Sequence, residues 1–324
     1  MSDKLYLASS ISKEQEYMYL SQKGRAQQKL AEVFLSCKIG DQVPTFNDLH
    51  KEFKVGTGTI QSALKEFETN GIVQLKAQPR YGTTLVGKDV EKLWQFLPKK
   101  HVIGLFPEPF SLEMQGLAMG LREAFQELGI PLIIVYGYGS KVRFDRILSE
   151  QHTEDFVISS FASAKDRQLI NPELDVALRF KENSFYQKES LLVLENEQIQ
   201  KKKEIKIGID YSSFDHMLLT KMVFPDASYV DIKYSDVPYE VLTNIVDTAI
   251  WHRTIQPKFV SGKVISIGSC GKEMDNLKLT EVSEAVLTIN SNTKLMKGVL
   301  EHIDCAKVID IQKKVLAQEI QPIF

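Results

Sequence analysis

Polar side chains follow three segments of this chain whose apolar runs predict buried strands. They stand at 106–111 (FPEPFS), at 159–163 (SSFAS) and at 210–213 (DYSS), each just before a predicted helix. In open α/β sheets, ligands bind beyond the carboxyl ends of the strands, where the first amides of a helix attract anions. Two serine-rich helix starts therefore predict a site that clasps a carboxylate or a phosphate. The candidate ligand-binding residues are Pro107, Tyr138, Ser159, Ser160, Asp210, Tyr211, Ser212, Ser213, Asp247 and Trp251.

The same residue types also have purely structural uses. Ser212 and Ser213 are suited to be ordinary helix N-caps. Trp251 is suited to pack between a strand and a helix. Asp210 and Asp247 are suited to cap helices or to form hydrogen bonds between the two lobes. Arg143, on a predicted helix at 143–150, can pair with an acidic ligand, but a helical arginine is by default on the surface. Both interpretations stay open at this level.

The residues that usually carry catalysis are not grouped in the sequence. The six histidines are scattered, and no two stand at a metal-ligand spacing with a cysteine or an acid. The segment 268–272 (GSCGK) is shorter than a P-loop, and Cys270 has no histidine near it along the chain. The segment 137–139 (GYG) lacks the third glycine of a dinucleotide fingerprint. We therefore predict that the protein is not an enzyme and has no metal and no cofactor.

A second set of polar residues lies near the front of the chain, where the pattern predicts three helices. Apolar residues at helical spacing mark 26–36, a segment from about 46, and 60–67. Thr45 and Asp48 predict a capping box at the second helix, and Gly40 predicts the left-handed turn that ends the first. Alternating residues at 72–75 and 83–86, around a basic and aromatic loop at 78–82, predict a hairpin. Three helices and a hairpin make a winged helix-turn-helix.

The outer face of the third helix and the tip of the hairpin predict contact with double-stranded DNA. Short polar side chains suit a groove, and Lys65 and Arg80 suit phosphates. Replacing Gln61 by alanine is expected to change base preference, whereas replacing Arg80 should weaken binding to all sequences alike. A winged helix can instead dock a protein without touching DNA. The candidate DNA-binding residues are Thr45, Asn47, Thr57, Gly58, Thr59, Gln61, Ser62, Lys65, Arg80, Tyr81, Gly82 and Thr83.

This front segment resembles the GntR-type DNA-binding domain. The matching positions are Gly40-Asp41-x-x-Pro44, Leu49, Val55-x-x-x-Thr59-Ile60-x-x-Ala63-Leu64, Gly71-Ile72-Val73 and Arg80-x-Gly82-Thr83. The resemblance implies a recognition helix in the major groove and a wing near the backbone or the minor groove. Such domains usually carry arginines in the turn and early in the recognition helix, where this chain has Gly58 and Gln61. The change removes two guanidiniums that would contact phosphate or guanine and leaves Gln61 able to bind adenine.

From residue 101 onward the chain alternates strands and helices. Strands at 101–106, 131–136 and 156–159 alternate with helices, which predicts a parallel sheet with helices on both faces. The segment 175–197 breaks this rhythm. A second series follows, with strands at 206–210, 228–232 and 248–251 and late strands at 264–267 and 285–289. A chain that leaves one lobe, builds a second and returns predicts a two-lobed α/β domain of the type 2 periplasmic-binding-like fold, with a ligand cleft between the lobes.

The order of these segments resembles the YhfZ-type regulators, in which a GntR-like winged helix precedes a solute-binding-like domain. The resemblance implies a transcriptional regulator with a small-molecule effector, and a homodimer that uses paired half-sites. It supplies no effector identity and no operator. The segments that carry it are 37–41 (CKIGD), 92–94 (KLW), 116–121 (GLAMGL), 159–162 (SSFA), 208–215 (GIDYSSFD), 247–251 (DTAIW) and 311–322 (IQKKVLAQEIQP).

Length and charge agree with this organisation, because 324 residues exceed one ordinary core. The net charge is -2, while the segment 23–88 has ten Lys/Arg against six Asp/Glu, which weakly favours a polyanion partner for the front. Three distant cysteines, no apolar run of membrane length and no signal peptide predict a cytoplasmic protein without a membrane partner.

The expected parts are an N-terminal extension at 1–22, the winged helix at 23–87, a linker helix at 88–100 and the effector domain at 101–324. Within the effector domain, lobe 1 is expected at about 101–180 plus 285–324, and lobe 2 at about 181–284.

These observations predict a DNA-binding regulator whose rear domain senses a small, anionic metabolite and closes around it. The alternative is a non-catalytic solute-sensing or scaffold protein whose winged helix docks protein. An enzyme on the same fold is the least favoured interpretation.

Overall fold

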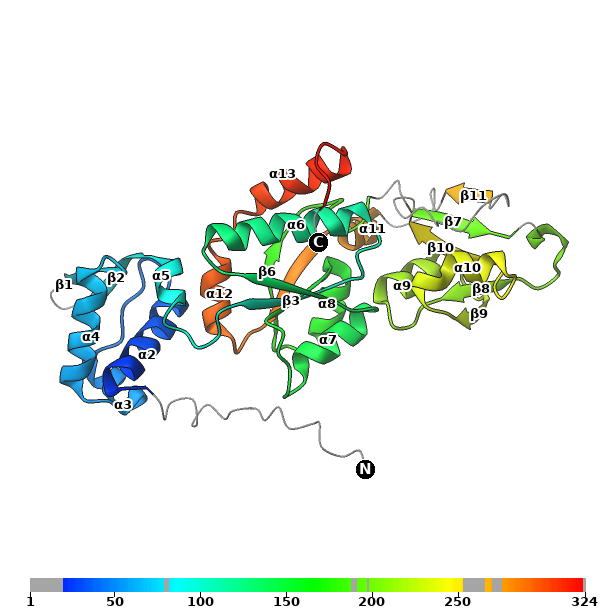
Figure 1. The fold of residues 1–324 in the computed structure, drawn as a ribbon. Helices are drawn as coiled ribbons and strands as arrows, with labels where there is room; N and C mark the ends of the chain where they lie inside the picture. Colours follow the sequence, from blue (N-terminus) through cyan, green and yellow to red (C-terminus); the bar gives the residue numbers. More distant parts are fainter. Residues whose placement is uncertain are drawn as a thin grey trace, which may run out of the picture. The chain divides into compact units, whose positions relative to one another are not determined.

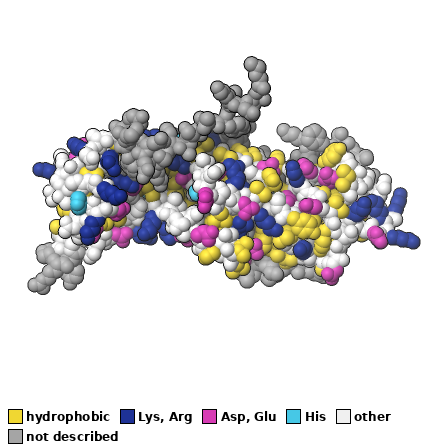
Figure 2. Space-filling view, turned by 90° about the horizontal axis from the view of Figure 1, so that it is seen from below, with side chains coloured by type: hydrophobic (Ala, Val, Ile, Leu, Met, Phe, Trp, Pro, Cys, Tyr) yellow, Lys and Arg dark blue, Asp and Glu magenta, His cyan; other side chains and the backbone are white. Residues whose placement is uncertain are grey.

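The computed structural model describes residues 20–78, 82–187, 191–196, 198–252, 266–269 and 276–322. The chain forms two compact units, Met1–Lys100 and His101–Phe324. Among the helices of the described ranges, none has both the length and the apolar character needed to cross a membrane. Acidic and basic side chains are interspersed on the face that Figure 2 shows, as the net charge of -2 would suggest.

Unit 1 contains the three predicted helices. They are α2 (Gln22–Ser36), α3 (Phe46–Phe53) and α4 (Thr57–Thr69). The predicted capping box of α3 is confirmed, because the Thr45 hydroxyl accepts from the Asp48 amide at 3.3 Å and the Asp48 carboxylate accepts from the Thr45 amide at 3.3 Å. Helix α2 begins four residues earlier than 26, because the Ser21 hydroxyl caps it by accepting from the Gly24 amide at 3.1 Å. Its polar first turn has no apolar spacing to reveal it.

The predicted hairpin is present as β1 (Val73–Gln78) paired antiparallel with β2 (Gly82–Lys88). Gly40, with a φ of 100°, turns the chain after α2, and its amide donates to the Leu85 carbonyl at 2.8 Å. The Val43 amide likewise donates to the Thr83 carbonyl at 2.7 Å, so the segment 40–43 adds to the sheet of the wing. A short helix, α5 (Val90–Trp94), follows and packs against α2.

The core of unit 1 explains why α4 is held in place. Ile60, Ala63, Leu64 and Phe67, the inward residues expected for the third helix, are all buried. The Phe67 ring lies 6.4 Å from that of Phe34 and 4.8 Å from that of Phe96. Burial of this stripe leaves the opposite face of α4 to solvent.

Unit 2 contains two five-stranded sheets, with the orders β4-β3-β5-β12-β6 and β11-β7-β10-β8-β9. Figure 1 shows helices on both faces of the first sheet, with α6 (Leu112–Glu127) and α13 (Cys305–Leu316) over one face and α7 (Ser140–Leu148) and α8 (Phe161–Ile170) over the other. The strands of the first sheet are β3 (Val102–Phe106), β4 (Leu132–Tyr136), β5 (Phe156–Ser160), β6 (Leu174–Arg179) and β12 (Ala285–Asn290).

The second sheet packs its two faces against α9 (Phe214–Val223) and α10 (Val237–Leu242). Its strands are β7 (Leu191–Glu195), β8 (Lys206–Ile209), β9 (Ser228–Asp231), β10 (Thr248–His252) and β11 (Ser266–Ser269). The remaining elements of unit 2 are the short helices η3 (Ile199–Lys201), η4 (Tyr234–Asp236), α11 (Asn276–Ser283) and α12 (Lys294–Leu300). Helix α11 packs against α8. The predicted strand at 264–267 begins outside the described residues, and Cys270 also lies outside them.

The expectation of purely parallel sheets is wrong at one strand of each sheet. Strand β12 is antiparallel to β5 and β6, and β7 is antiparallel to β10 and β11. Strand β7 follows β6 of the other sheet, and β12 follows β11 of the other sheet by way of α11. Neither is therefore joined to a preceding strand of its own sheet by the helical crossover that makes two strands parallel. Both sheets thus share one arrangement: three parallel strands lie side by side, the antiparallel strand (β12 or β7) follows them, and a fifth strand (β6 or β11) lies at the edge. This repeated arrangement confirms the predicted two-lobed, type 2 periplasmic-binding-like fold.

Candidate functional site

A pocket of unit 2 with a cavity volume of about 70 Å³ is lined by both lobes. Its walls come from the segments that follow β3, β4, β8 and β9, which are the carboxyl ends of parallel strands. Of the ten residues predicted from the sequence to bind a ligand, four line it. These four are Pro107, Tyr138, Asp210 and Ser213. The other six, which do not line it, are Ser159, Ser160, Tyr211, Ser212, Asp247 and Trp251.

Ser160 joins the two lobes behind the pocket. Its hydroxyl caps α8 by accepting from the Ser163 amide at 3.0 Å and donates to a carboxylate oxygen of Asp215 at 2.6 Å. Asp215 lies at the start of α9 in the second lobe and is buried. The serine that was expected to clasp a ligand therefore clasps a carboxylate of the protein itself. Ser159 is buried beside it, and its hydroxyl donates to the Ser160 carbonyl at 3.0 Å.

Asp210 shapes the wall of the pocket that belongs to the second lobe. Its carboxylate accepts from the Ser212 amide at 2.8 Å, from the Ser212 hydroxyl at 2.6 Å and from the Tyr234 amide at 3.0 Å. Its own amide donates to Nδ1 of His216 at 2.9 Å, and Nε2 of that imidazole lies 3.1 Å from the Ile250 carbonyl, to which it donates. Burial lowers the pKa of His216, so the ring is neutral. The candidate Tyr211, between these residues, is exposed.

Asp247 and Trp251 have structural contacts instead of pocket contacts. The Asp247 carboxylate accepts from the Lys206 amide at 2.9 Å, from the Asn196 side-chain amide at 2.9 Å and from the Lys202 ammonium. Burial alone would raise the pKa of Asp247, but these donors outweigh it and lower the pKa below its ordinary value. Trp251 is buried, with its ring 4.8 Å from that of Tyr234.

Replacing Asp247 by asparagine is expected to lower the free energy of unfolding by about 1–2 kcal/mol, since a buried set of donors loses its charged acceptor. A lowered folded-state pKa contributes stability above the unfolded-state pKa, and that stability is lost as pH falls through the folded value. Urea unfolding of both proteins should therefore show a difference at pH 7 that shrinks below about pH 4. A loss of ligand binding at unchanged stability would contradict this assignment.

Arg143 lies in the pocket and not on the surface, where a helical arginine is expected by default. It is 4 % exposed and lines the pocket. Its Nη1 donates to the Gly137 carbonyl at 2.9 Å, while its Nε has no hydrogen-bond partner among the described residues. Burial lowers its pKa to about 10, so the guanidinium is still charged at neutral pH. Its place in the first turn after β4, at a strand's carboxyl end, was the available signal.

The other ionisable groups of the pocket differ in their environments. Burial raises the pKa of Asp215 to about 7, although the Ser160 hydrogen bond and the Arg143 charge oppose it. Burial also raises the pKa of Glu108. Desolvation raises the pKa of the Tyr186 and Tyr234 phenols, which therefore remain neutral hydroxyl groups.

The two lobes touch directly at the edge of the pocket. Gly139, with a φ of 56°, precedes α7, and the Lys141 amide donates to the Ser212 carbonyl at 3.1 Å. The Ser140 hydroxyl accepts from the Phe214 amide at 3.1 Å. The start of α7 in one lobe is thus bonded to the start of α9 in the other, which describes a closed arrangement of the lobes.

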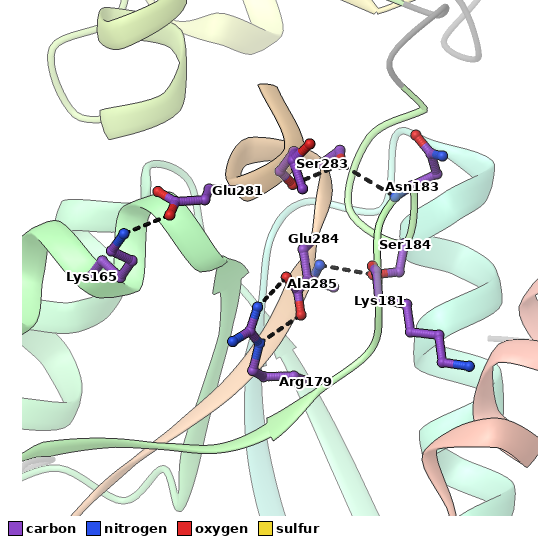
Figure 3. Close-up of polar contacts among 10 residues, drawn as sticks. Lys165, Arg179, Lys181, Asn183, Ser184, Glu281, Ser283, Glu284 and Ala285 are labelled. Carbon is purple, nitrogen blue, oxygen red and sulfur yellow. Dashed lines mark hydrogen bonds and ion pairs between the residues drawn. The ribbon is translucent and has the colours of Figure 1, made fainter. Parts of the chain in front are cut away.

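The two crossings between the lobes are bonded to each other, as Figure 3 shows. The Arg179 guanidinium donates to both carboxylate oxygens of Glu284, at 2.7 and 2.6 Å. The Asn183 amide donates to the Ser283 hydroxyl at 3.3 Å, and the Ala285 amide to the Ser184 hydroxyl at 2.8 Å. A paired crossing of this kind gives the lobes a common hinge.

The outer face of α4 has the exposure that DNA contact requires. Thr57, Gly58, Gln61, Ser62 and Lys65 are exposed, and Thr59 is half-buried. No side chain caps α4 and its first turn contains no acid, so its first amides are available to a phosphate.

The other predicted DNA-binding residues lie at the start of α3 and in the wing. Thr45 and Asn47 are exposed, although the Thr45 hydroxyl is engaged in the capping box. Gly82 is exposed and Thr83 half-buried at the start of β2, whereas Arg80 and Tyr81 lie outside the described residues.

Replacing Gly58 by arginine is expected to strengthen binding to a mixed-sequence DNA duplex several-fold. No atom lies within 4 Å of a Cβ built at this position, so the helix accepts the side chain. One added phosphate contact should steepen the dependence of log affinity on log salt by about 1. Fluorescence anisotropy over a salt series measures both quantities, with Gly58→Ala as the control that adds no charge. Equal salt slopes for the two variants would place this face away from DNA.

Two families of known proteins match the chain. A family described as "YhfZ C-terminal domain" matches residues 89–324, and one described as "Helix-turn-helix domain" matches residues 38–85. The chain is 24% identical over 310 residues to "Uncharacterized protein YhfZ" of Escherichia coli (strain K12), covering 94% of this chain and 99% of that protein.

Two solved structures also align with the second unit of the chain. The crystal structure of YhfZ from Shigella flexneri aligns with a TM-score of 0.57 at 20% identity, covering 73% of this chain and 98% of that chain. The periplasmic aliphatic sulphonate binding protein SsuA from Escherichia coli aligns with a TM-score of 0.47 at 12% identity, covering 68% of this chain and 76% of that chain.

Proposed function

The chain belongs to the YhfZ family, and from this premise we propose that it is a DNA-binding transcriptional regulator whose two-lobed domain binds a small molecule with an acid group. The family predicted from the sequence is confirmed by the two matches. A helix-turn-helix domain joined to a solute-binding-like fold points to a ligand-responsive regulator and away from an enzyme.

The observation that carries the acidic character of the ligand is the environment of Arg143. Its guanidinium is buried in the pocket, and no carboxylate of the described residues lies within the 4.0 Å of an ion pair. An unpaired buried charge costs several kcal/mol, so an anion that enters the pocket gains a strong partner. A carboxylate or a phosphate matches the planar donors of arginine.

The DNA-binding part of the proposal rests on α4. Its exposed polar face, its uncapped N-terminus and the GntR-like spacing support a recognition helix in the major groove. We also propose a homodimer that binds paired half-sites, in the cytoplasm where such DNA is found. A ligand can regulate binding only if it favours one arrangement of the two DNA-binding units over another.

The test begins with the protein purified under native conditions, denatured, and analysed by mass spectrometry for released small acids. The released acid is then added back in a DNA-binding assay by fluorescence anisotropy. A stoichiometric acid that changes DNA affinity supports the whole proposal. An empty protein whose DNA affinity responds to no acid would count against the sensor.

The DNA interface has its own test, which separates it from a protein-docking surface. Gln61→Ala should change the preferred base at one position, whereas Lys65→Ala should weaken all sequences alike. Retention on DNA that ignores salt, or no retention at low salt, would favour docking of a protein.

A further inference from the structure

The pocket contains a second buried ionisable group that has no ion-pair partner among the described residues. Asp215 is 2 % exposed, lines the same pocket as Arg143, and has one hydrogen-bond donor among the described residues, the Ser160 hydroxyl at 2.6 Å. That bond uses one carboxylate oxygen, Oδ1, and leaves the other for a ligand. The pocket thus holds a buried guanidinium and, besides the hydrogen-bonded Asp210, a buried carboxyl group at Asp215, and no ion pair within 4.0 Å joins Arg143 or Asp215 to another of the described residues.

The remaining charged groups of the pocket are placed differently. Asp210 already accepts three hydrogen bonds from Ser212 and Tyr234. Lys233 is exposed, with its ammonium 5.7 Å from the centre of the Tyr138 ring, which is itself 48% exposed. Glu108 is half-buried and is the one other carboxylate that could receive a cation from the ligand.

We propose that the ligand is a small amino acid, whose carboxylate binds Arg143 and whose amino group binds Asp215. This inference rests on the proposed function, because it names the ligand class of the same pocket. A zwitterion supplies the missing partner to both buried groups at once, whereas a simple acid leaves Asp215 desolvated without a cation.

The surroundings of the two groups agree with such a ligand. Phe110, Met114 and Phe185 line the pocket and offer apolar surface to the remainder of the molecule. Burial raises the pKa of Asp215 to about 7, so the carboxyl is about half ionised at neutral pH, and an arriving ammonium group favours the ionised form. Since Asp215 belongs to the second lobe and Arg143 to the first, one amino acid would hold both lobes together.

The test uses the full-length protein and three matched sets of probes. These are the twenty common amino acids, the corresponding acids without the amino group, and the corresponding amines without the carboxylate. Thermal unfolding identifies the amino acids that raise the melting temperature, and calorimetry then gives their affinities. We expect at least one amino acid to bind and to bind more than 10-fold more tightly than either of its two truncated analogues.

The residue assignment has its own variants. Asp215→Asn keeps the shape of the side chain and an acceptor for Ser160, and it should weaken the amino acid more than 10-fold while changing the affinity of the deaminated acid less than 3-fold. Glu108→Gln tests the competing carboxylate of the pocket and should weaken the amino acid less than Asp215→Asn does. Asp231→Asn, at an exposed position of β9 that does not line the pocket, is the matched control and should leave both affinities within 3-fold. Circular dichroism establishes that the three variants are folded.

The outcomes separate this inference from the function beneath it. Deaminated acids that bind as tightly as amino acids would overturn the inference and leave an acid sensor standing. Failure of every amino acid to bind would overturn it as well, and failure of every acid would also count against the proposed function. If Glu108→Gln weakens binding of the amino acid and Asp215→Asn does not, the role given to Asp215 is overturned.

Discussion

Replacing Arg143 by methionine is expected to weaken binding of an acidic ligand by about 100-fold or more, because the ligand would lose a buried, charged hydrogen-bond partner. The same change should leave the ligand-free protein at least as stable as the original. A buried guanidinium without an ion pair among the described residues carries a desolvation cost that methionine does not. The affinity should therefore fall while the stability of the ligand-free protein stays the same or rises. A packing defect would instead lower both.

Calorimetry with the acid released from the native protein measures the affinity, and thermal unfolding without ligand measures the stability. Arg146→Met is the matched control, since Arg146 lies on the same helix, pairs with Glu154 and does not line the pocket. It should keep the affinity within about 2-fold. An Arg143→Met protein that is folded and binds the acid unchanged would remove the basis of the proposed ligand class.

The position of the pocket could be predicted from the sequence, but the burial of Arg143 in it could not. Strand ends follow from local apolar runs, so the segments around Pro107, Tyr138 and Asp210 were found. Burial of Arg143 depends on the second lobe and the crossing segment, whose Tyr186 lines the same pocket. Such contacts join residues far apart in the sequence, and no local pattern reports them.

The misplaced candidates have a related cause. Asp247 precedes β10, so it lies at the amino end of its strand, where it binds Lys202 and Lys206. Trp251 lies within β10 on the face that packs against α10. To predict the positions of Asp247 and Trp251, one would need to know in which direction β10 runs in the sheet and which of its faces each side chain occupies. By contrast, the helices of unit 1 follow from capping residues and apolar spacing, which act within a few residues.

Replacing Gly139 by valine is expected to weaken ligand binding by about 10-fold or more by preventing the lobes from meeting. Gly139 has a φ of 56°, which a β-branched residue rarely adopts, at a cost of order 1–3 kcal/mol. A Cβ at this position would also lie 2.3 Å from the Ser212 hydroxyl oxygen and 2.8 Å from the Ser212 carbonyl oxygen in the other lobe. The backbone carbonyl cannot rotate away as a side chain can, so the closed arrangement is disfavoured.

The apparent affinity of a ligand that needs closed lobes falls in proportion to the closed fraction, whereas contacts within each lobe are unchanged. Small-angle scattering should show a larger radius for Gly139→Val, and circular dichroism should show the same helix content. Gly139→Ala is the graded comparison, since its Cβ would meet the same Ser212 atoms without the β-branch, and it should weaken binding less than Gly139→Val does. If closure of the lobes is also what alters DNA binding, Gly139→Val should have the DNA affinity of the original protein without ligand. This should hold at every ligand concentration at which the variant stays open. Normal ligand affinity in an expanded variant would mean that the site is built on one lobe alone, and closure would then have no part in sensing.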